Sequence, residues 1–251
     1  MTEHSATLVA HSAKFACEIV TREQLGRYPA PTGTSTWRPV AHAELVGTII
    51  DQLGSFNLRP VREQYAVGKG GLALFGAIDL ANGWSHEARA MALGFRHSND
   101  KDLAIQLVGG ARVFVCDNLA LSGEKIALRK HSRSLHLAEL IRGGLDRFLD
   151  AFKRFDAQVI EAEGHEITDE AAKVRLFDLR YQGVMPVSIA DEAAENYFRA
   201  EALGYADSQP RTTWGLHNAC TRAVKALAPA SQYRVLTGIG RAFGFGAPSS
   251  N

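Results

Sequence analysis

Residues 58–95, LRPVREQYAVGKGGLALFGAIDLANGWSHEARAMALGF, decide the fold of this chain. They contain three extended runs, 58–67, 72–80 and 87–95, which are separated by the glycine-rich GKGG and by ANGWS. Glycine tolerates the positive φ angles that tight hairpin turns require. In the middle run, apolar side chains alternate onto one face at Leu72, Leu74, Ile78 and Leu80. The segment therefore predicts a three-stranded antiparallel meander.

The segments on either side of the meander predict further elements. Before it, PVAHAELVGTIIDQLGSF has apolar residues at helical spacing and predicts an amphipathic helix with Pro39 at its first position. After it, NDKDLAIQLVGG predicts a short helix that Asn99 or Asp100 caps and Gly109 ends. Two more strands are expected in ARVFVCDN and EKIALRKHS, with LALSG between them.

From about residue 134 the pattern becomes helical. The expected helices cover residues 135–164, 168–182, 187–203, 212–227 and 232–243. Strands that precede helices, rather than alternate with them, indicate the α+β class. We expect an N-terminal helix with an antiparallel β-meander and further strands, followed by a mainly helical C-terminal half. The predicted divisions are an irregular segment at 1–38, an α+β core at 39–133 and a helical region packed on the core at 134–251.

Composition favours a cytoplasmic globular protein. Of the 251 residues, 46% are hydrophobic and 22% are charged, which is ordinary for a folded domain that can bury a sizeable core. No apolar run is long enough to span a bilayer, so no membrane partner is expected. The N-terminal sequence lacks the features of a signal peptide. The widely spaced Cys17, Cys116 and Cys220 argue against a disulfide framework and fit a reducing compartment.

Charge is distributed unevenly along the chain, although the formal net charge is only +1. Residues 161–207 carry eleven acidic and four basic side chains, a net of −7. Residues 208–251 carry five basic side chains and no acidic one, and residues 124–160 carry eight basic and five acidic ones. Two basic regions around an acidic one are compatible with a polyanion-binding face, or with acidic and basic helices that pair inside the fold.

The segment 94–123, GFRHSNDKDLAIQLVGGARVFVCDNLALSG, has the densest set of polar side chains. Cys116 beside Asp117, with His97 upstream, offers a nucleophile, a base and an orienting group. No glycine elbow frames the cysteine, so a small buried side chain is the alternative interpretation. Possible metal donors are present, but their spacing matches no known metal motif, so we predict no metal and no cofactor. These donors are His97, Asp100, Asp102, Asp117, His131 and His136.

A nucleic-acid ligand is the main alternative to catalysis. Basic residues cluster at the ends of predicted strands, in GFRHSNDK and ALRKHSR, and in the acid-free RTTWGLHNACTRAVK. Such side chains contact phosphates, and exposed aromatic rings stack on bases. The aromatic candidates are Tyr65, Trp84, Phe95 and Trp214, which would otherwise belong to the core.

Four stretches, namely TSTWRPVAHAELVGTIID, LFGAIDL, residues 94–123 and RTTWGLHNACTRAV, carry a resemblance to a known family. The chain resembles phage- and plasmid-associated bacterial proteins catalogued as a domain of unknown function, and the resemblance extends through nearly all of it. The resemblance implies a context of mobile genetic elements and assigns no residue a role.

The order of helix, antiparallel meander and helix is similar to the core of Rad52-type single-strand annealing proteins. Those proteins form rings and hold single-stranded DNA in a basic groove, so a homo-oligomer is compatible with this resemblance. It implies phosphate contacts from the basic side chains of the central region, which are Arg96, His97, Lys101, Arg112, Arg129, Lys130 and Arg133.

We therefore predict a non-catalytic nucleic-acid-binding protein of mobile-element origin, with single-stranded DNA as the expected partner. The first alternative is an enzyme of unknown class that uses the polar segment from His97 to His136, with Cys116, His97 and Asp117 as its catalytic residues. The second alternative is a protein–protein interaction factor, such as an inhibitor of a host-defence complex.

Overall fold

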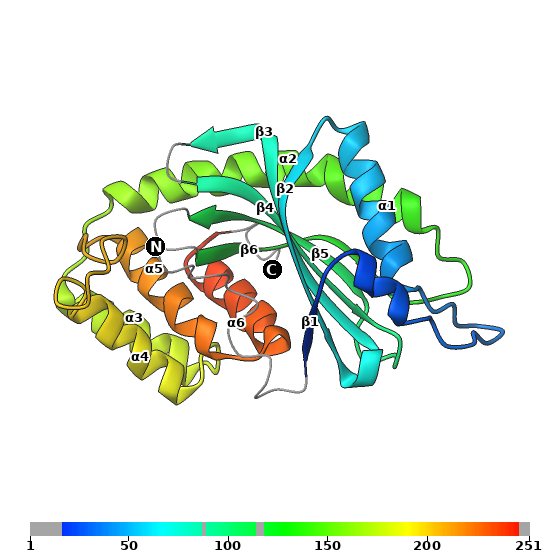
Figure 1. Cartoon of the computed structure of the whole chain (residues 1–251). Coiled ribbons are helices and arrows are strands. Elements are labelled where there is room, and N and C mark those ends of the chain that lie inside the picture. The colour runs from blue at the N-terminus through cyan, green and yellow to red at the C-terminus, as the bar shows by residue number, and fades with distance from the viewer. Residues whose placement is uncertain (1–16, 87–88, 114–117, 246–251) are drawn as a thin grey trace.

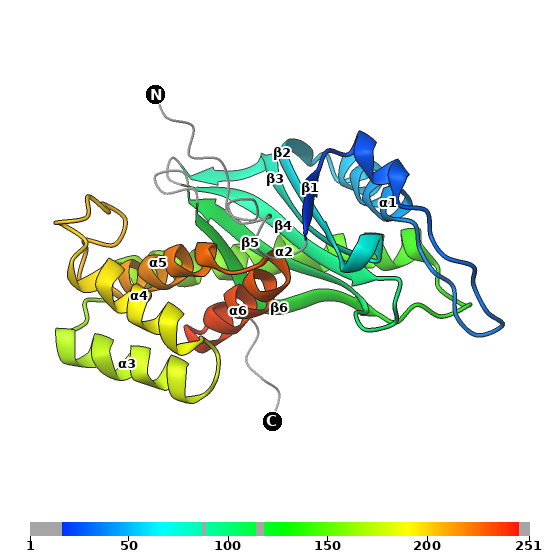
Figure 2. The same ribbon diagram turned by 60° about the horizontal axis from the view of Figure 1, so that its bottom comes forward.

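The computed structural model describes residues 17–86, 89–113 and 118–245. Six antiparallel strands form one sheet in the order of the chain. Helices α1 and α2 cover one face, whereas α5 and α6 cover part of the other (Figure 1). Helices α3 and α4 lie outside α5 as a further layer (Figure 2). The fold is α+β, as the sequence predicts.

The strands are β1 (Glu18–Val20), β2 (Arg59–Gly68), β3 (Ala73–His86), β4 (Arg89–Ser98), β5 (Ile105–Val113) and β6 (Asn118–Arg129). The helices are α1 (His42–Ser55), α2 (Leu137–Gly164), α3 (Asp169–Tyr181), α4 (Val187–Phe198), α5 (Thr213–Ala223) and α6 (Pro229–Ala242). None of the helices in the described ranges combines the length and the apolar character needed to cross a bilayer.

The predicted meander corresponds to β2, β3 and β4, and its first turn forms where expected. Lys69, Gly70 and Gly71 all have positive φ angles, of 53°, 64° and 96°. The second turn is displaced, because ANGWS continues β3 instead of ending it. The pairing of β3 with β4 shifts register between Leu80 and Ser85, so this stretch is accommodated as an irregularity within the hairpin.

The helix predicted for residues 99–110 is wrong, since the second half of that stretch belongs to β5 and the first half is a turn. Asn99 and Asp100 instead belong to the turn before β5, where the Asp100 carboxylate accepts a hydrogen bond from the backbone N–H of Asp102 (3.0 Å). Gly109 does not end a helix. A Cβ atom at Gly109 would lie 2.9 Å from the Phe148 ring of α2, so glycine is required for the close approach of that helix. The two strands expected around LALSG are the end of β5 and the single strand β6.

Two differences concern the N-terminal region. The predicted irregular segment 1–38 contains the short strand β1, which pairs with β2. Helix α1 begins at His42 rather than Pro39. The side chain of Asn99 explains this boundary, because its oxygen accepts from the N–H of Val40 (3.1 Å) and its nitrogen donates to the Val40 carbonyl (2.8 Å). These bonds hold the residues before α1 in an extended conformation.

Two apolar cores lie on opposite faces of the sheet. The first joins the sheet to α1 and α2 and includes Phe148, Phe152 and Phe155. At about 1.5 Å per residue, α2 is long enough to extend about 42 Å along the sheet. The second core joins the other face to α3–α6. The helical region therefore contributes to both faces, and the second face carries the pocket described below.

We expect Gly76→Ala to lower the free energy of unfolding by about 1–3 kcal/mol, the usual cost of overpacking a core. Gly76 pairs with Phe95, and an added Cβ would lie 2.2 Å from the Phe95 ring, which is fully buried. Urea unfolding followed by circular dichroism measures the effect. Gly54→Ala in α1 is the control, because a Cβ there meets no atom within 4 Å. Equal stability of the two variants would contradict the prediction.

Candidate functional site

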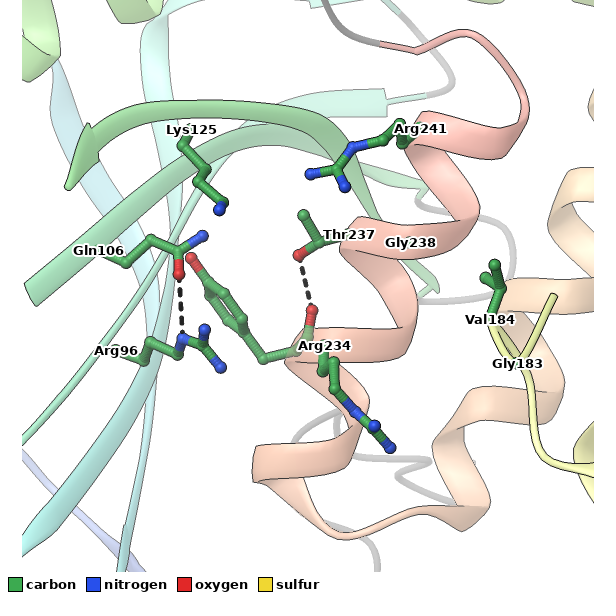
Figure 3. A pocket seen from close by; sticks show the side chains of 10 residues that line it. Arg96, Gln106, Lys125, Gly183, Val184, Arg234, Thr237, Gly238 and Arg241 are labelled. Carbon is green, nitrogen blue, oxygen red and sulfur yellow. Dashed lines mark hydrogen bonds between the residues drawn. The ribbon is translucent and has the colours of Figure 1, made fainter. Parts of the chain in front are cut away.

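A positively charged pocket of about 270 Å³ lies where the sheet meets α6 (Figure 3). We call it the β4–α6 pocket. The sheet contributes Arg96 from β4, Gln106 from β5 and Lys125 from β6. The loop between α3 and α4 contributes Gly183 and Val184. The remaining wall is one side of α6, formed by Tyr233, Arg234, Thr237, Gly238 and Arg241.

Strand register explains how the sheet side of the pocket is built. Arg96 pairs directly with Gln106 across β4 and β5. Alternate side chains of a strand lie on the same face of the sheet. Arg96 lies an even number of positions from Ala92 on β4, and Gln106 lies an even number of positions from Val108 on β5. Because Ala92 and Val108 belong to the second core, Arg96 and Gln106 face α6. The pairing of β5 with β6 shifts register next to Val108, and Val108 itself pairs with Lys125. The three polar side chains thus come together from adjacent strands.

The helix side follows from the period of α6. Residues 233, 237 and 241 are four positions apart and therefore share one side of the helix. Figure 3 shows Lys125 and Arg241 extending toward one another across one end of the pocket, whereas Arg234 extends toward the opposite end. Gly238 allows a close approach to the α3–α4 loop, since a Cβ there would lie 3.0 Å from Val184.

Arg96 is held in place by two contacts. Its Nε donates a hydrogen bond to Oε1 of Gln106 (3.1 Å). Its guanidinium carbon lies 5.1 Å from the centre of the Tyr233 ring, a cation–π distance. Because the Gln106 side chain accepts through its oxygen, its amide nitrogen is left as a donor on the pocket side (Figure 3).

The hydroxyl of Tyr233 is the most informative atom of the site. The side chain is only 3% exposed, and the hydroxyl has no hydrogen-bond partner in the part of the chain that the structure describes. Burial raises the pKa of Tyr233, although the positive charge of Arg96 opposes the shift, so the hydroxyl keeps its proton. A buried, unpartnered hydroxyl costs about 1–3 kcal/mol, which a ligand oxygen in the pocket would recover.

The charged side chains that line the pocket all carry the same sign. Four of its lining side chains are cationic, and none of the described side chains that line it is acidic. Lys125, Arg234 and Arg241 are exposed and Arg96 is half-buried, so the pocket presents its positive charge to the solvent. The hydrogen-bonding groups that project into the pocket are mainly donors, so the complementary ligand is an anion that carries several acceptor oxygens.

The basic residues predicted from the sequence do not form one groove. Arg96 lines the β4–α6 pocket. Four exposed residues, which we call the strand-end cluster, lie near the ends of β4 and β6: Lys101, Arg129, Lys130 and Arg133. Within this cluster, Lys101 lies over the Trp37 ring (5.0 Å), and the backbone N–H of Arg133 donates to the Thr36 carbonyl (3.1 Å). The 36–37 segment thus brings these two residues to the same part of the surface.

The structure corrects the expectation for Arg112, which is 1% exposed. Its Nε lies 3.1 Å from Asp79 Oδ2, and its terminal nitrogen donates to the Gln64 side chain (3.2 Å). Arg112 therefore neutralises a buried carboxylate and does not reach a ligand at the surface.

The expectation for His97 is corrected as well, because this side chain is fully buried. Its Nε2 lies 2.8 Å from Nδ1 of His42, and its ring stacks on His131 with centroids 5.3 Å apart. Burial lowers the pKa of all three histidines, and for His97 the two neighbouring imidazoles lower it further. The three rings are therefore neutral at pH 7 and pack between α1 and the sheet.

The other candidates for chemistry are not brought together in the described structure. Cys116 and Asp117 lie outside the described residues, so their arrangement with His97 is not placed. Asp100 and Asp102 both bind Lys69. His136 is exposed, and no group of three or more metal-ligating side chains with suitable geometry occurs within the described ranges.

Of the residues that line the pocket, sequence reasoning named only Arg96 and missed, among others, Gln106, Lys125, Tyr233, Arg234 and Arg241. One signal pointed to them, because Arg234 and Arg241 belong to the C-terminal stretch without acidic residues. That stretch gives no indication of which strand α6 covers, so it does not identify the partners on the sheet.

No protein-family model, curated protein or solved structure matches this chain. The geometry of the β4–α6 pocket therefore carries the functional inference.

Proposed function

We propose that this protein binds nucleic acid, with single-stranded DNA as the first candidate, through its phosphates and without catalysis. The observation that supports the proposal is the β4–α6 pocket, which is lined by four cations and by a tyrosine whose buried hydroxyl has no partner among the described residues. Phosphate groups are anions with several acceptor oxygens, which is the chemistry that such a set of donors recognises.

Two further observations favour a polymer over an isolated anion. The strand-end cluster offers exposed cations for additional phosphates of a longer ligand. Lys101 of this cluster also lies beside the partly exposed Trp37, a ring on which a base can stack. An origin in a mobile element, which the resemblance to proteins of phages and plasmids implies, stays a prediction, because no family model matches the chain.

Lys125→Gln/Arg234→Gln is expected to weaken binding to a labelled single strand of about 30 nucleotides and to reduce its salt dependence. Each phosphate contact to a single strand contributes about −0.7 to the slope of log K against log salt, so the loss of two contacts reduces the slope by about 1.4. Fluorescence anisotropy between about 50 and about 200 mM salt measures both quantities.

The matched control is Arg142→Gln/Lys153→Gln, which removes the same charge from exposed positions of α2, on the opposite face of the sheet. It should leave the slope unchanged. Arg129→Ala/Lys130→Ala tests whether the strand-end cluster takes part. The absence of binding at low salt, or an equal loss in the pocket and control variants, would exclude the proposed function.

A further inference from the structure

We propose that the β4–α6 pocket binds the terminal phosphomonoester of a nucleic-acid strand in preference to its internal phosphodiesters. This inference rests on the proposed function and assigns the pocket a specific part of the ligand. It depends on the charge of the pocket, on its donors and on its walls.

Charge is the first argument. An internal phosphodiester carries one negative charge, whereas a phosphomonoester carries about −1.5 to −2 at pH 7. Four cationic side chains line a single pocket of about 270 Å³ with no acidic residue among its described walls. Lys125 and Arg241 extend toward one another across one end of it (Figure 3). A dianion in the pocket is attracted to this set of cations more strongly than a monoanion is.

The donors give the second argument. A terminal phosphate presents three acceptor oxygens, whereas an internal one presents only two that are not esterified. The pocket offers donors of three kinds: the charged groups of Arg96 and Lys125, the amide nitrogen of Gln106, and the hydroxyl of Tyr233. The Tyr233 hydroxyl is buried and without a partner among the described residues, so it needs an acceptor that enters the pocket.

The walls provide the third argument. The sheet, α6 and the α3–α4 loop form walls on different sides of the pocket, which is open to the surface between them. Its volume is slightly below the range of about 300–1,000 Å³ that is typical of small-molecule sites. An internal phosphate requires the chain to enter and to leave, whereas a terminal phosphate requires only one opening. The strand-end cluster remains available to the nucleotides that follow.

The test compares three versions of one labelled DNA strand of about 12 nucleotides. At this length, the phosphates that follow the terminal one can also contact the strand-end cluster. One version carries a 5′-phosphate, one a 3′-phosphate, and one has hydroxyl groups at both ends. Anisotropy is measured for the full-length protein and for Tyr233→Phe, which removes only the unpartnered hydroxyl. Tyr197→Phe is the matched control, because its hydroxyl is also buried and without a partner in the described structure but lies in α4, outside the pocket.

We expect the protein to bind one of the phosphorylated strands about tenfold more tightly than the hydroxyl strand, as a hydrogen bond to a charged group predicts. Tyr233→Phe should abolish most of this difference, and Tyr197→Phe should preserve it. Inorganic phosphate and a mononucleotide, added as competitors, distinguish a strand end from a free phosphate.

Equal, salt-sensitive binding of all three strands would overturn the terminal-phosphate inference and leave the proposed function intact. A preference that survives in Tyr233→Phe would overturn it as well. If no strand binds, the proposed function and this inference both fail. If the mononucleotide or inorganic phosphate binds but none of the three DNA strands does, the pocket is a site for small anions, and the proposed function and this inference are both wrong.

Discussion

Replacing Arg112 by methionine is expected to lower the free energy of unfolding by about 3–5 kcal/mol, the usual effect of removing one partner of a buried ion pair. Methionine fills part of the space of the arginine side chain but cannot neutralise Asp79. The Asp79 carboxylate lies on the same buried face of the sheet and is 4% exposed, so it would be left without its cation. Gln64 would also lose a hydrogen bond. Chemical denaturation followed by circular dichroism measures the change.

The double variant Asp79→Leu/Arg112→Met serves as the control. Replacing both members of a buried pair with apolar side chains is often nearly neutral, because the cost of desolvating the charges disappears together with their attraction. We therefore expect the double variant to regain most of the stability that Arg112→Met loses. If the single variant unfolds at the same denaturant concentration as the native protein, the structural role of Arg112 is refuted.

Acidification below about pH 6.5 is expected to destabilise the protein through its buried histidines. His217 is fully buried between Trp214, Phe243 and Phe245, and burial lowers its pKa to about 3. The pKa values of His42, His97 and His131 are also lowered, mainly by burial. Between the folded and unfolded pKa values, only the unfolded state binds the proton. The stability contributed by these rings is therefore complete above about pH 6.5 and decreases as the pH falls.

The size of this effect follows from proton linkage. Each histidine that takes up a proton only on unfolding contributes about 1.4 kcal/mol per pH unit, so His217 alone accounts for about 2 kcal/mol at pH 5. Against the effect of burial, hydrogen bonds from Lys69 and Ser98 lower the pKa of Asp100 to about 2. The stability that this carboxylate contributes is therefore lost only when the pH falls below the pKa of an unfolded aspartate. Between about pH 6.5 and about pH 4.5, the change in the free energy of unfolding therefore comes mainly from histidine protonation.

His217→Phe tests this assignment. The phenyl ring can keep the stack on Trp214, where the centroids are 4.8 Å apart, and it has no group to protonate. Denaturant unfolding at several pH values should show a slope shallower by one proton, about 1.4 kcal/mol per pH unit. His136→Phe, at an exposed position before α2, is the control and should leave the slope unchanged. An unaltered slope in His217→Phe would disprove the assignment.

Local pattern was sufficient to predict most of the elements but misled at β5. The alternation of Leu72, Leu74 and Ile78 and the GKGG turn predicted the meander, because strand pleating and hairpin turns depend on neighbouring residues. Residues 105–110, IQLVGG, have no alternation, since this strand is buried on both faces, and their glycines resembled a helix end. The Phe148 ring that requires Gly109 is 39 residues further along the chain, out of reach of any local pattern.

The sequence by itself determined the fold class, the order of helix, meander and helices, and the basic character of the C-terminal stretch, because periodicity and composition are local properties of the chain. Only the tertiary structure decided which charged residues meet. Arg96 and Arg112 occupy neighbouring strands and both lie on the face of the second core, yet one lines a pocket and the other neutralises Asp79 in the core. Their difference arises because α6, more than 100 residues later, brings Tyr233, Arg234 and Arg241 over one end of the sheet. Such long-range packing depends on strand register and helix placement, which no single segment encodes.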